Sequence, residues 1–419
     1  MLNLKCLLSC ALFAYTQTAS AAPDFSALAA PALPGADPFY QPPAGFESKQ
    51  PGTILRNRPV PNPLVGFLGA PIKVASAHQI LYRTTDTFGK AIVTVSTVLI
   101  PKNANPSRLL SYQVAEDAAN PNCAPSYVFQ QGSQTGGFLG TVVTQIEANV
   151  INDALDNGWY VTVPDFLGPK SAFLANVLAG QAVLDGIRAT LASSSFTKLA
   201  ANPIVNMWGY SGGSLASGFA AELQPSYAPE LKIAGVVLGG TCPDILSVMF
   251  TINKTFFAAL IATGILGLAE EYPEIASLVA DQVIPEKAQA VLDVKSKCLA
   301  AAVLAFSGQD IFSYVKDPTI FNGTVAKTVT DANGMGHAAP KIPVLIYKAT
   351  NDEVSPVADT DKVVDFYCKG GSSVDYRRTG STSGHIGMLF NGKAAALAWL
   401  KDRFNGVPAK QGCTTSTKL

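Results

Sequence analysis

The chain has 419 residues, of which 48% are apolar and 14% charged, and its 30 basic and 30 acidic side chains cancel. This neutrality argues against nucleic acid as a partner, because phosphate binding needs a basic face. The length and the apolar content favour one domain with a large buried core and a sizeable insertion over two equal domains.

The first 21 residues have the pattern of a secretory signal peptide. Lys5 precedes an apolar stretch, and the small residues Ala19, Ser20 and Ala21 follow it. The apolar stretch has about 10 residues, whereas a membrane span needs about 20. We therefore predict cleavage near Ala21 and a secreted, extracellular protein without a stable membrane span.

The cysteines and the glycosylation sequences fit this compartment. Cys6 and Cys10 would leave with the signal peptide, and the remaining five would allow two disulfides and one free thiol. The cysteines and histidines show no spacing typical of zinc ligands, so no metal is expected. Asn253 and Asn322 each begin an Asn-x-Thr sequence and are the expected glycosylation sites.

The segments after the signal peptide alternate between strand and helix patterns. Residues 22–63 are rich in Pro, Gly and Ala and predict an irregular surface arm. The β-branched segments 79–86 and 91–102 predict an antiparallel pair of strands. Helical patterns then separate the predicted buried strands 108–115, 159–165, 202–209, 231–240 and 342–350. Such alternation is typical of an α/β fold, with helices on both faces of a parallel sheet.

The alternation stops between residues 243 and 330, where the pattern is nearly all helical. Within this stretch Thr255 to Ala269 carries no charge, but its 15 residues are too few to span a bilayer. A buried helix and a lid over a site remain the alternatives. We therefore predict a core of residues 22–242 and 331–419, interrupted by a helical insertion over 243–330.

Ser211 lies in Gly-Tyr-Ser-Gly-Gly, the single match to G-x-S-x-G in the chain. This pattern forms a sharp, strained turn from strand to helix that holds a serine nucleophile, and larger side chains in place of the glycines would clash there. An apolar strand pattern precedes Ser211 and a helix pattern of small residues follows it. This context favours a reactive serine over a plain glycine-rich turn.

A serine needs a base to act as a nucleophile, and the chain has three histidines. His78 precedes Ser211, which is the wrong chain order for this kind of hydrolase, and His337 lies on a loop that leads into a strand. His385 follows the last predicted strand on a loop before the C-terminal helix, which is where the base is expected.

The base needs an acid to orient it and to stabilise the imidazolium. Asp352 comes directly after the apolar strand predicted over 342–350, so its carboxylate should lie at the carboxyl end of that strand. Aspartates further along belong to the following helix and are expected in solvent. The order Ser211, Asp352, His385 is that of the α/β-hydrolases, and we predict these residues as a catalytic triad.

Several stretches resemble the fungal secretory lipase family: LLSYQVAEDAANPNCAPSY (109–127), LDGIRA (184–189), GYSGG, YAPELKIAG (227–235) and NDEVSP (351–356). They occur in the family's order along the whole mature chain. The resemblance implies an α/β-hydrolase fold with a mostly helical lid after the strand that follows the nucleophile, and the same triad.

The resemblance also implies roles for residues that position alone does not assign. Asp117 and the backbone N–H of Gly212 would form the oxyanion hole, although Asp117 as a simple loop cap is the alternative. The implied disulfides join Cys123 to Cys298 and Cys368 to Cys413. Cys242 would then be unpaired, and we expect it to be a buried thiol.

Together these features predict a secreted serine lipase or carboxylesterase that hydrolyses (tri)acylglycerols and other fatty-acyl esters through an acyl-enzyme. It would work without a cofactor, as a monomer, at oil–water interfaces. The alternative within enzymes is an esterase or acyltransferase specific for a secondary metabolite ester. A binding module on an inactive hydrolase fold would require a broken triad.

Overall fold

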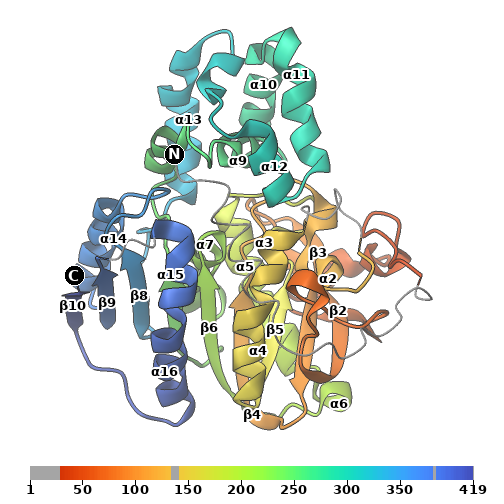
Figure 1. Ribbon diagram of the computed structural model, residues 1–419. Coiled ribbons are helices and arrows are strands. Elements are labelled where there is room, and N and C mark those ends of the chain that lie inside the picture. Colours follow the sequence, from red (N-terminus) through yellow and green to blue (C-terminus); the bar gives the residue numbers. More distant parts are fainter. Residues whose placement is uncertain (1–28, 134–140, 381–383, 419) are drawn as a thin grey trace, which may run out of the picture.

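The computed structural model describes residues 29–133, 141–380 and 384–418; the predicted signal peptide, residues 1–21, lies outside the described residues. Ten strands of the described chain form one mixed sheet in the order β1-β2-β3-β5-β4-β6-β7-β8-β9-β10 (Figure 1). Their bounds are β1 (Ile54–Pro59), β2 (Val74–Thr85), β3 (Ala91–Pro101), β4 (Asn105–Gln113), β5 (Trp159–Pro164), β6 (Ile204–Tyr210), β7 (Ile233–Gly239), β8 (Val344–Ala349), β9 (Val374–Thr379) and β10 (Cys413–Lys418).

The sheet is antiparallel at one end and parallel elsewhere. Strands β1, β2, β3 and β5 pair antiparallel in that order, and all pairs from β5 to β10 are parallel. Every residue of β5 and β8 is buried, as expected for parallel strands that helices cover on both faces. The α/β fold class predicted from the sequence is confirmed.

Helices cover the two faces of the sheet with separate apolar cores. Helices α5 and α7 pack on one face, and α4 and α16 pack on the other (Figure 1). The α-helices that the structure describes outside the insertion are α2 (Pro125–Val128), α3 (Val142–Ile146), α4 (Ala148–Asp156), α5 (Asn176–Leu191), α6 (Ser194–Thr197), α7 (Gly212–Tyr227), α14 (Val357–Lys369), α15 (Gly384–Asn391) and α16 (Lys393–Phe404).

Between β7 and β8 the chain forms a layer of helices above the sheet (Figure 1). These are α8 (Ile245–Ile252), α9 (Ala259–Leu268), α10 (Pro273–Gln282), α11 (Pro285–Leu292), α12 (Leu299–Phe306) and α13 (Thr324–Asn333). The only strand-like pairing within the layer is an isolated bridge between Val283 and Val315. In the part of the chain that the structure describes, no helix is long and apolar enough to cross a membrane.

Two local predictions were wrong, and one strand was not predicted. The arm over residues 22–63 contains strand β1, and a further strand, β10, follows the last predicted helix. Both are edge strands, and β10 is polar and mostly exposed, so neither shows the apolar pattern of a buried strand. His385 lies in the first turn of α15 and not on a loop. The polar segment before it hid this helix, which begins at Gly384 with a positive φ of 58°.

Candidate active site

Ser211 lies at the sharp turn between β6 and α7. Its φ is 51° and its ψ is −120°, a backbone conformation that is strained for a residue with a side chain. Gly209 and Gly213 must be glycine because backbone atoms lie too close to leave room for a Cβ atom. A Cβ on Gly209 would lie 2.0 Å from the Gly213 carbonyl oxygen, and one on Gly213 would lie 1.9 Å from the Gln113 carbonyl oxygen. The turn therefore presents the Ser211 hydroxyl at the carboxyl end of β6.

The structure brings Ser211, His385 and Asp352 together in one chain of hydrogen bonds. Ser211 Oγ lies 2.8 Å from His385 Nε2, and His385 Nδ1 lies 2.8 Å from Asp352 Oδ2. The other carboxylate oxygen, Oδ1, accepts from the N–H groups of Val354 and Ser355, both at 2.9 Å. Asp352 thus holds the imidazole with its Nε2 facing the Ser211 hydroxyl.

The charge on Asp352 is strongly favoured although its side chain is only 1% exposed. Burial alone would raise the pKa of Asp352, but a protonated His385 and the Lys348 ammonium, together with the hydrogen bonds that Asp352 accepts, hold this pKa well below its usual value. Asp352 therefore stays ionised at every pH at which an esterase of this kind would be assayed.

The other two histidines make different contacts. The ring of His78 packs on Phe196 with their centroids 5.4 Å apart. His337 Nε2 is 2.9 Å from the Asp331 carbonyl oxygen, and the His337 N–H donates to Glu222 at 2.9 Å. Neither is joined to Ser211 by a hydrogen bond among the described residues.

Asp117 follows β4 and lies against Gly212. Its φ is 45°, its side chain is buried, and a Cβ on Gly212 would lie 1.9 Å from Asp117 Oδ1. Oδ1 has no hydrogen-bond partner among the described residues. Burial raises the pKa of Asp117 to about 7, against the opposing effect of His385. Gly212 is the first residue of α7, so its N–H has no carbonyl one turn earlier in the helix to bond.

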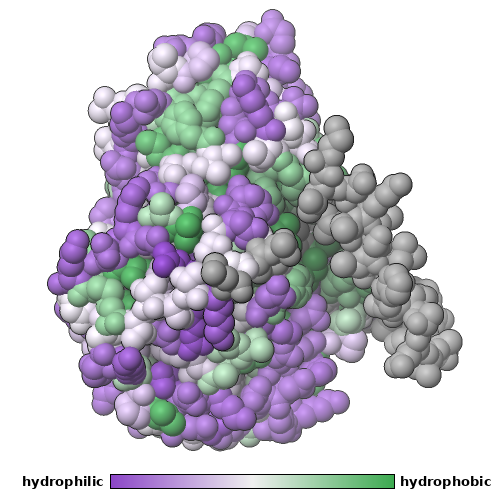
Figure 2. Space-filling model, turned by 60° about the vertical axis from the view of Figure 1, so that its left-hand side comes forward, coloured by the Kyte–Doolittle hydropathy of each residue, from purple (hydrophilic) through white to green (hydrophobic). Residues whose placement is uncertain are grey.

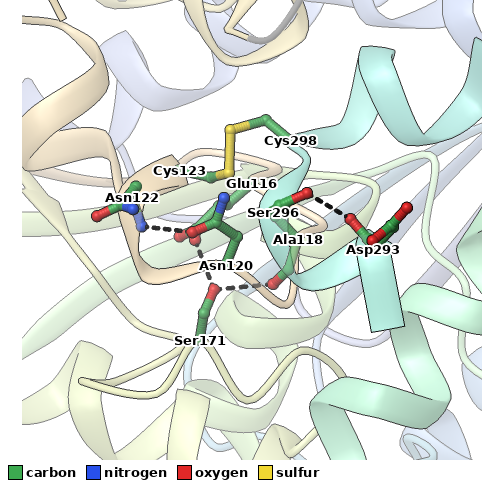
Figure 3. Close-up of a disulfide and its surroundings, with 9 residues drawn as sticks. All are labelled: Glu116, Ala118, Asn120, Asn122, Cys123, Ser171, Asp293, Ser296 and Cys298. Carbon is green, nitrogen blue, oxygen red and sulfur yellow. Dashed lines mark hydrogen bonds between the residues drawn. A yellow bond between two sulfur atoms is a disulfide. The ribbon is translucent and has the colours of Figure 1, made fainter. Parts of the chain in front are cut away.

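Ser171 contacts the residues on both sides of Asp117, namely Glu116 and Ala118 (Figure 3). Ser171 Oγ lies 2.9 Å from Glu116 Oε1 and 2.8 Å from the Ala118 carbonyl oxygen. Burial raises the pKa of Glu116 well above its usual value. Because a hydroxyl has a single proton, a protonated Glu116 that donates to Ser171, which in turn donates to Ala118, satisfies all three groups.

Two disulfides match the pairs that the family resemblance implies. Cys123, on the loop that follows Asp117, is bonded to Cys298 at the start of α12 (Figure 3). Cys368 is bonded to Cys413 and so joins α14 to β10. Cys242 is a buried free thiol, as expected, and burial raises its pKa to about 12.

An apolar cavity of about 140 Å³ opens onto Ser211. Asp117, Ser211 and Gly212 line one part of it. Most of the remaining wall comes from aliphatic and aromatic side chains of the helical layer, among them Ile261, Ile265 and Phe321. The cavity therefore joins the serine to an apolar enclosure that suits a hydrocarbon chain.

Two charged residues next to the triad were not found by the sequence reasoning. The Lys348 ammonium lies 3.0 Å from Asp352 Oδ2, and Glu353 Oε2 accepts a hydrogen bond from the backbone N–H of His385 at 2.8 Å. The one available signal was a lysine inside an otherwise apolar strand. Among the described residues, no group of three or more His, Cys, Asp or Glu side chains could hold a metal ion.

Comparisons with known proteins agree with the family resemblance. A family model described as secretory lipase matches residues 133–412. Lipase A of Arthroderma benhamiae is 48% identical over 391 residues, which cover 93% of this chain and 83% of that protein. Lipase 4 of Candida albicans is 40% identical over 94% of this chain and 86% of its own length.

Solved structures show the same likeness. Candida antarctica lipase A in its closed state superposes with a TM-score of 0.83 at 29% identity, over 93% of this chain and 91% of that chain. The rice cell wall degrading esterase LipA from Xanthomonas oryzae has a TM-score of 0.66 at 16% identity, which is a likeness of fold alone.

Proposed function

Because the chain belongs to the secretory lipase family, has the α/β-hydrolase fold and is a carboxylic ester hydrolase, we propose that it cleaves fatty-acyl esters, including (tri)acylglycerols, with Ser211 as nucleophile. The observation that carries this proposal is the chain of hydrogen bonds from Ser211 through His385 to Asp352, which lies against an apolar cavity.

Each residue of the site has a role in this reaction. Ser211 Oγ attacks the ester carbonyl while His385 Nε2 accepts its proton, and Asp352 stabilises the imidazolium. His385 then gives the proton to the leaving alcohol, and an acyl-enzyme on Ser211 remains. A water molecule, activated by the same imidazole, releases the fatty acid.

The oxyanion would be held by the backbone N–H groups of Gly212 and Asp117. The positive φ of Asp117 and its contact with Gly212 support this assignment. With its pKa raised to about 7 by burial, the Asp117 carboxyl is uncharged in mildly acidic solution and does not repel a developing negative charge.

The substrate is proposed from the chemistry of the cavity and of the helical layer. The cavity wall is almost entirely apolar and comes mainly from residues 243–330, which we propose as a lid over the core of residues 22–242 and 331–419. Figure 2 shows apolar side chains gathered on the upper, helical part of the molecule. Large exposed apolar residues of the lid are Phe250, Phe256, Leu292 and Leu304, as suits an enzyme that works as a monomer at an oil–water interface.

Secretion is proposed from the signal-peptide pattern, the family and the two disulfides. Of the two glycosylation sequences, Asn322 is exposed, whereas the Asn253 side-chain amide already donates to Asp310 at 2.8 Å. We therefore propose Asn322 as the better glycan acceptor.

The test is the initial hydrolysis rate of p-nitrophenyl esters from acetyl to palmitoyl, for wild type and Ser211→Ala. Loss of the nucleophile should lower kcat by several orders of magnitude, on the order of 10⁴ or more. Ser226→Ala is the matched control, because Ser226 is exposed near the end of α7, the helix that follows Ser211.

Wild type should prefer medium or long acyl chains, because they fill the apolar cavity. Full activity in Ser211→Ala would contradict the assignment of the nucleophile. Cleavage of acetyl esters alone would favour an esterase or acyltransferase specific for a secondary metabolite ester.

A further inference from the structure

Lys348 is a fully buried cation beside the triad. It lies in β8, all of whose residues are buried, and its side chain has 0% exposure. Its ammonium lies 3.0 Å from Asp352 Oδ2 and donates to the Thr241 carbonyl oxygen at 2.7 Å. Burying an ammonium costs free energy unless it is paired, so an apolar side chain here would be the ordinary choice for such a strand.

The oxygen that Lys348 contacts is the one that His385 uses. Asp352 Oδ2 faces both Lys348 Nζ and His385 Nδ1, at 3.0 and 2.8 Å, while Oδ1 accepts two backbone N–H groups. The carboxylate therefore has four donors and one available orientation. Through Thr241 the same ammonium also fixes the segment after β7 to β8.

We propose that Lys348 is a positioning residue of the triad, which locks the Asp352 carboxylate toward His385 and, by its charge, makes protonation of His385 harder, so that the imidazole stays a free base in more acidic solution. This inference rests on the proposed function, because it assumes that His385 is the base.

The electrostatic part follows from what else faces His385 and Asp352. Glu353, on the loop after β8, accepts a hydrogen bond from the backbone N–H of His385. Its negative charge opposes the effect of Lys348 on the protonation of His385. Burial raises the pKa of Asp117, which interacts with His385, to about 7. Burial raises the pKa values of Cys242 and Tyr210, so both are neutral near pH 7.

Lys348 is thus the cation among these groups, and it contacts the very oxygen that stabilises the imidazolium. Removing its charge leaves Asp352 freer to stabilise the charged form of His385. The protonated, inactive form of the base then persists to higher pH.

The test compares Lys348→Met, which keeps most of the length of the side chain without its charge, and Lys348→Gln, which instead offers a neutral N–H donor to Thr241. For both variants the acid limb of kcat/KM should move to higher pH by about one unit, a shift typical of one charge at close range. On that limb activity should fall about tenfold, with a smaller loss on the plateau.

The matched control is Lys393→Met, which removes an ion pair between the start of α16 and Asp153 of α4 and should not move the profile. The chain has three histidines, so His385 can be followed directly by NMR of ¹⁵N-histidine-labelled protein, assigned with His78→Gln and His337→Gln. This signal separates the titration of His385 from that of Asp117.

An upward shift of the His385 titration in both neutral variants supports the proposal. An unmoved His385 titration in both variants would overturn the proposal, whether or not the rate falls, and would leave Lys348 a packing role. If one variant does not fold, the other carries the test. Failure of the proposed function is seen separately, as activity that survives in Ser211→Ala.

Discussion

Cys123 and Cys298 are bonded across 175 residues of sequence, so the loop that carries Asp117 is tied covalently to the first turn of α12. Both cysteines are buried. The bond therefore joins one wall of the active site to the helical layer that closes the cavity. The second disulfide, Cys368–Cys413, closes 45 residues at the edge of the sheet.

This arrangement predicts unequal effects of removing the two disulfides. Replacing Cys123 and Cys298 by alanine should lower the free energy of unfolding by about 2–5 kcal/mol, and by about 1 kcal/mol more than the matched Cys368 and Cys413 replacement, because the closed loop is longer. Activity should fall more in the first variant, because its bond holds the Asp117 loop. Thermal unfolding and kcat/KM at a temperature where both variants are folded check this. Equal activity in the two double variants would contradict the link to Asp117.

Glu353 should matter for the position of His385. Its carboxylate accepts a hydrogen bond from the backbone N–H of His385 in the first turn of α15. The helix dipole favours a negative charge at this end of a helix. Glu353→Gln keeps the shape but loses the charge, so kcat should fall by a few-fold to about tenfold with little change in KM. Steady-state kinetics test this, with Glu274→Gln, in the first turn of α10, as the matched control. An unchanged kcat in Glu353→Gln would show that the charge of Glu353 does not help to position the base.

The burial of Glu147 makes the free energy of unfolding depend on pH. It is buried behind the Asp117 loop and accepts from Tyr112 at 2.6 Å and from the Ala115 N–H at 2.8 Å. Burial raises its pKa to about 8, against the lowering effect of these hydrogen bonds. Between the unfolded pKa of 4.5 and about 8, the folded state holds a proton that the unfolded state has lost. The free energy of unfolding is therefore highest at the acidic end of this window and falls as the pH rises through it.

The expected result is a melting temperature that decreases from about pH 5 to about pH 8, with a smaller decrease in Glu147→Gln. Glu47→Gln, an exposed site, is the matched control and should follow wild type. Differential scanning calorimetry at several pH values measures this. A wild-type melting temperature that rises over the window, or an identical slope in Glu147→Gln, would contradict the assignment.

The sequence predicted those features that leave a local pattern. The buried parallel strands are largely apolar runs, and the serine turn has its glycines at fixed positions. These patterns led to the α/β fold and to Ser211 and Asp352 at the ends of β6 and β8. Strands β1 and β10 were missed because edge strands need no apolar pattern to pair.

The remaining features depend on contacts between distant segments. The positive φ of Asp117 arises where its loop meets Gly212, and no residue type announces it. The pairing of Lys348 with Asp352 and Thr241 requires β7 and β8 to be neighbours in the sheet. Such relationships are set by tertiary packing and could not be read from local periodicity.

We infer that Ser211 carries the acyl group during turnover. This is tested most directly by titration with a p-nitrophenyl alkylphosphonate, which releases p-nitrophenolate when it phosphonylates an activated serine. We expect release of one equivalent per chain, loss of esterase activity in step with it, and an adduct on the peptide that contains Ser211. Ser211→Ala should release none. An adduct on another residue, or full labelling of Ser211→Ala, would show that Ser211 is not the nucleophile.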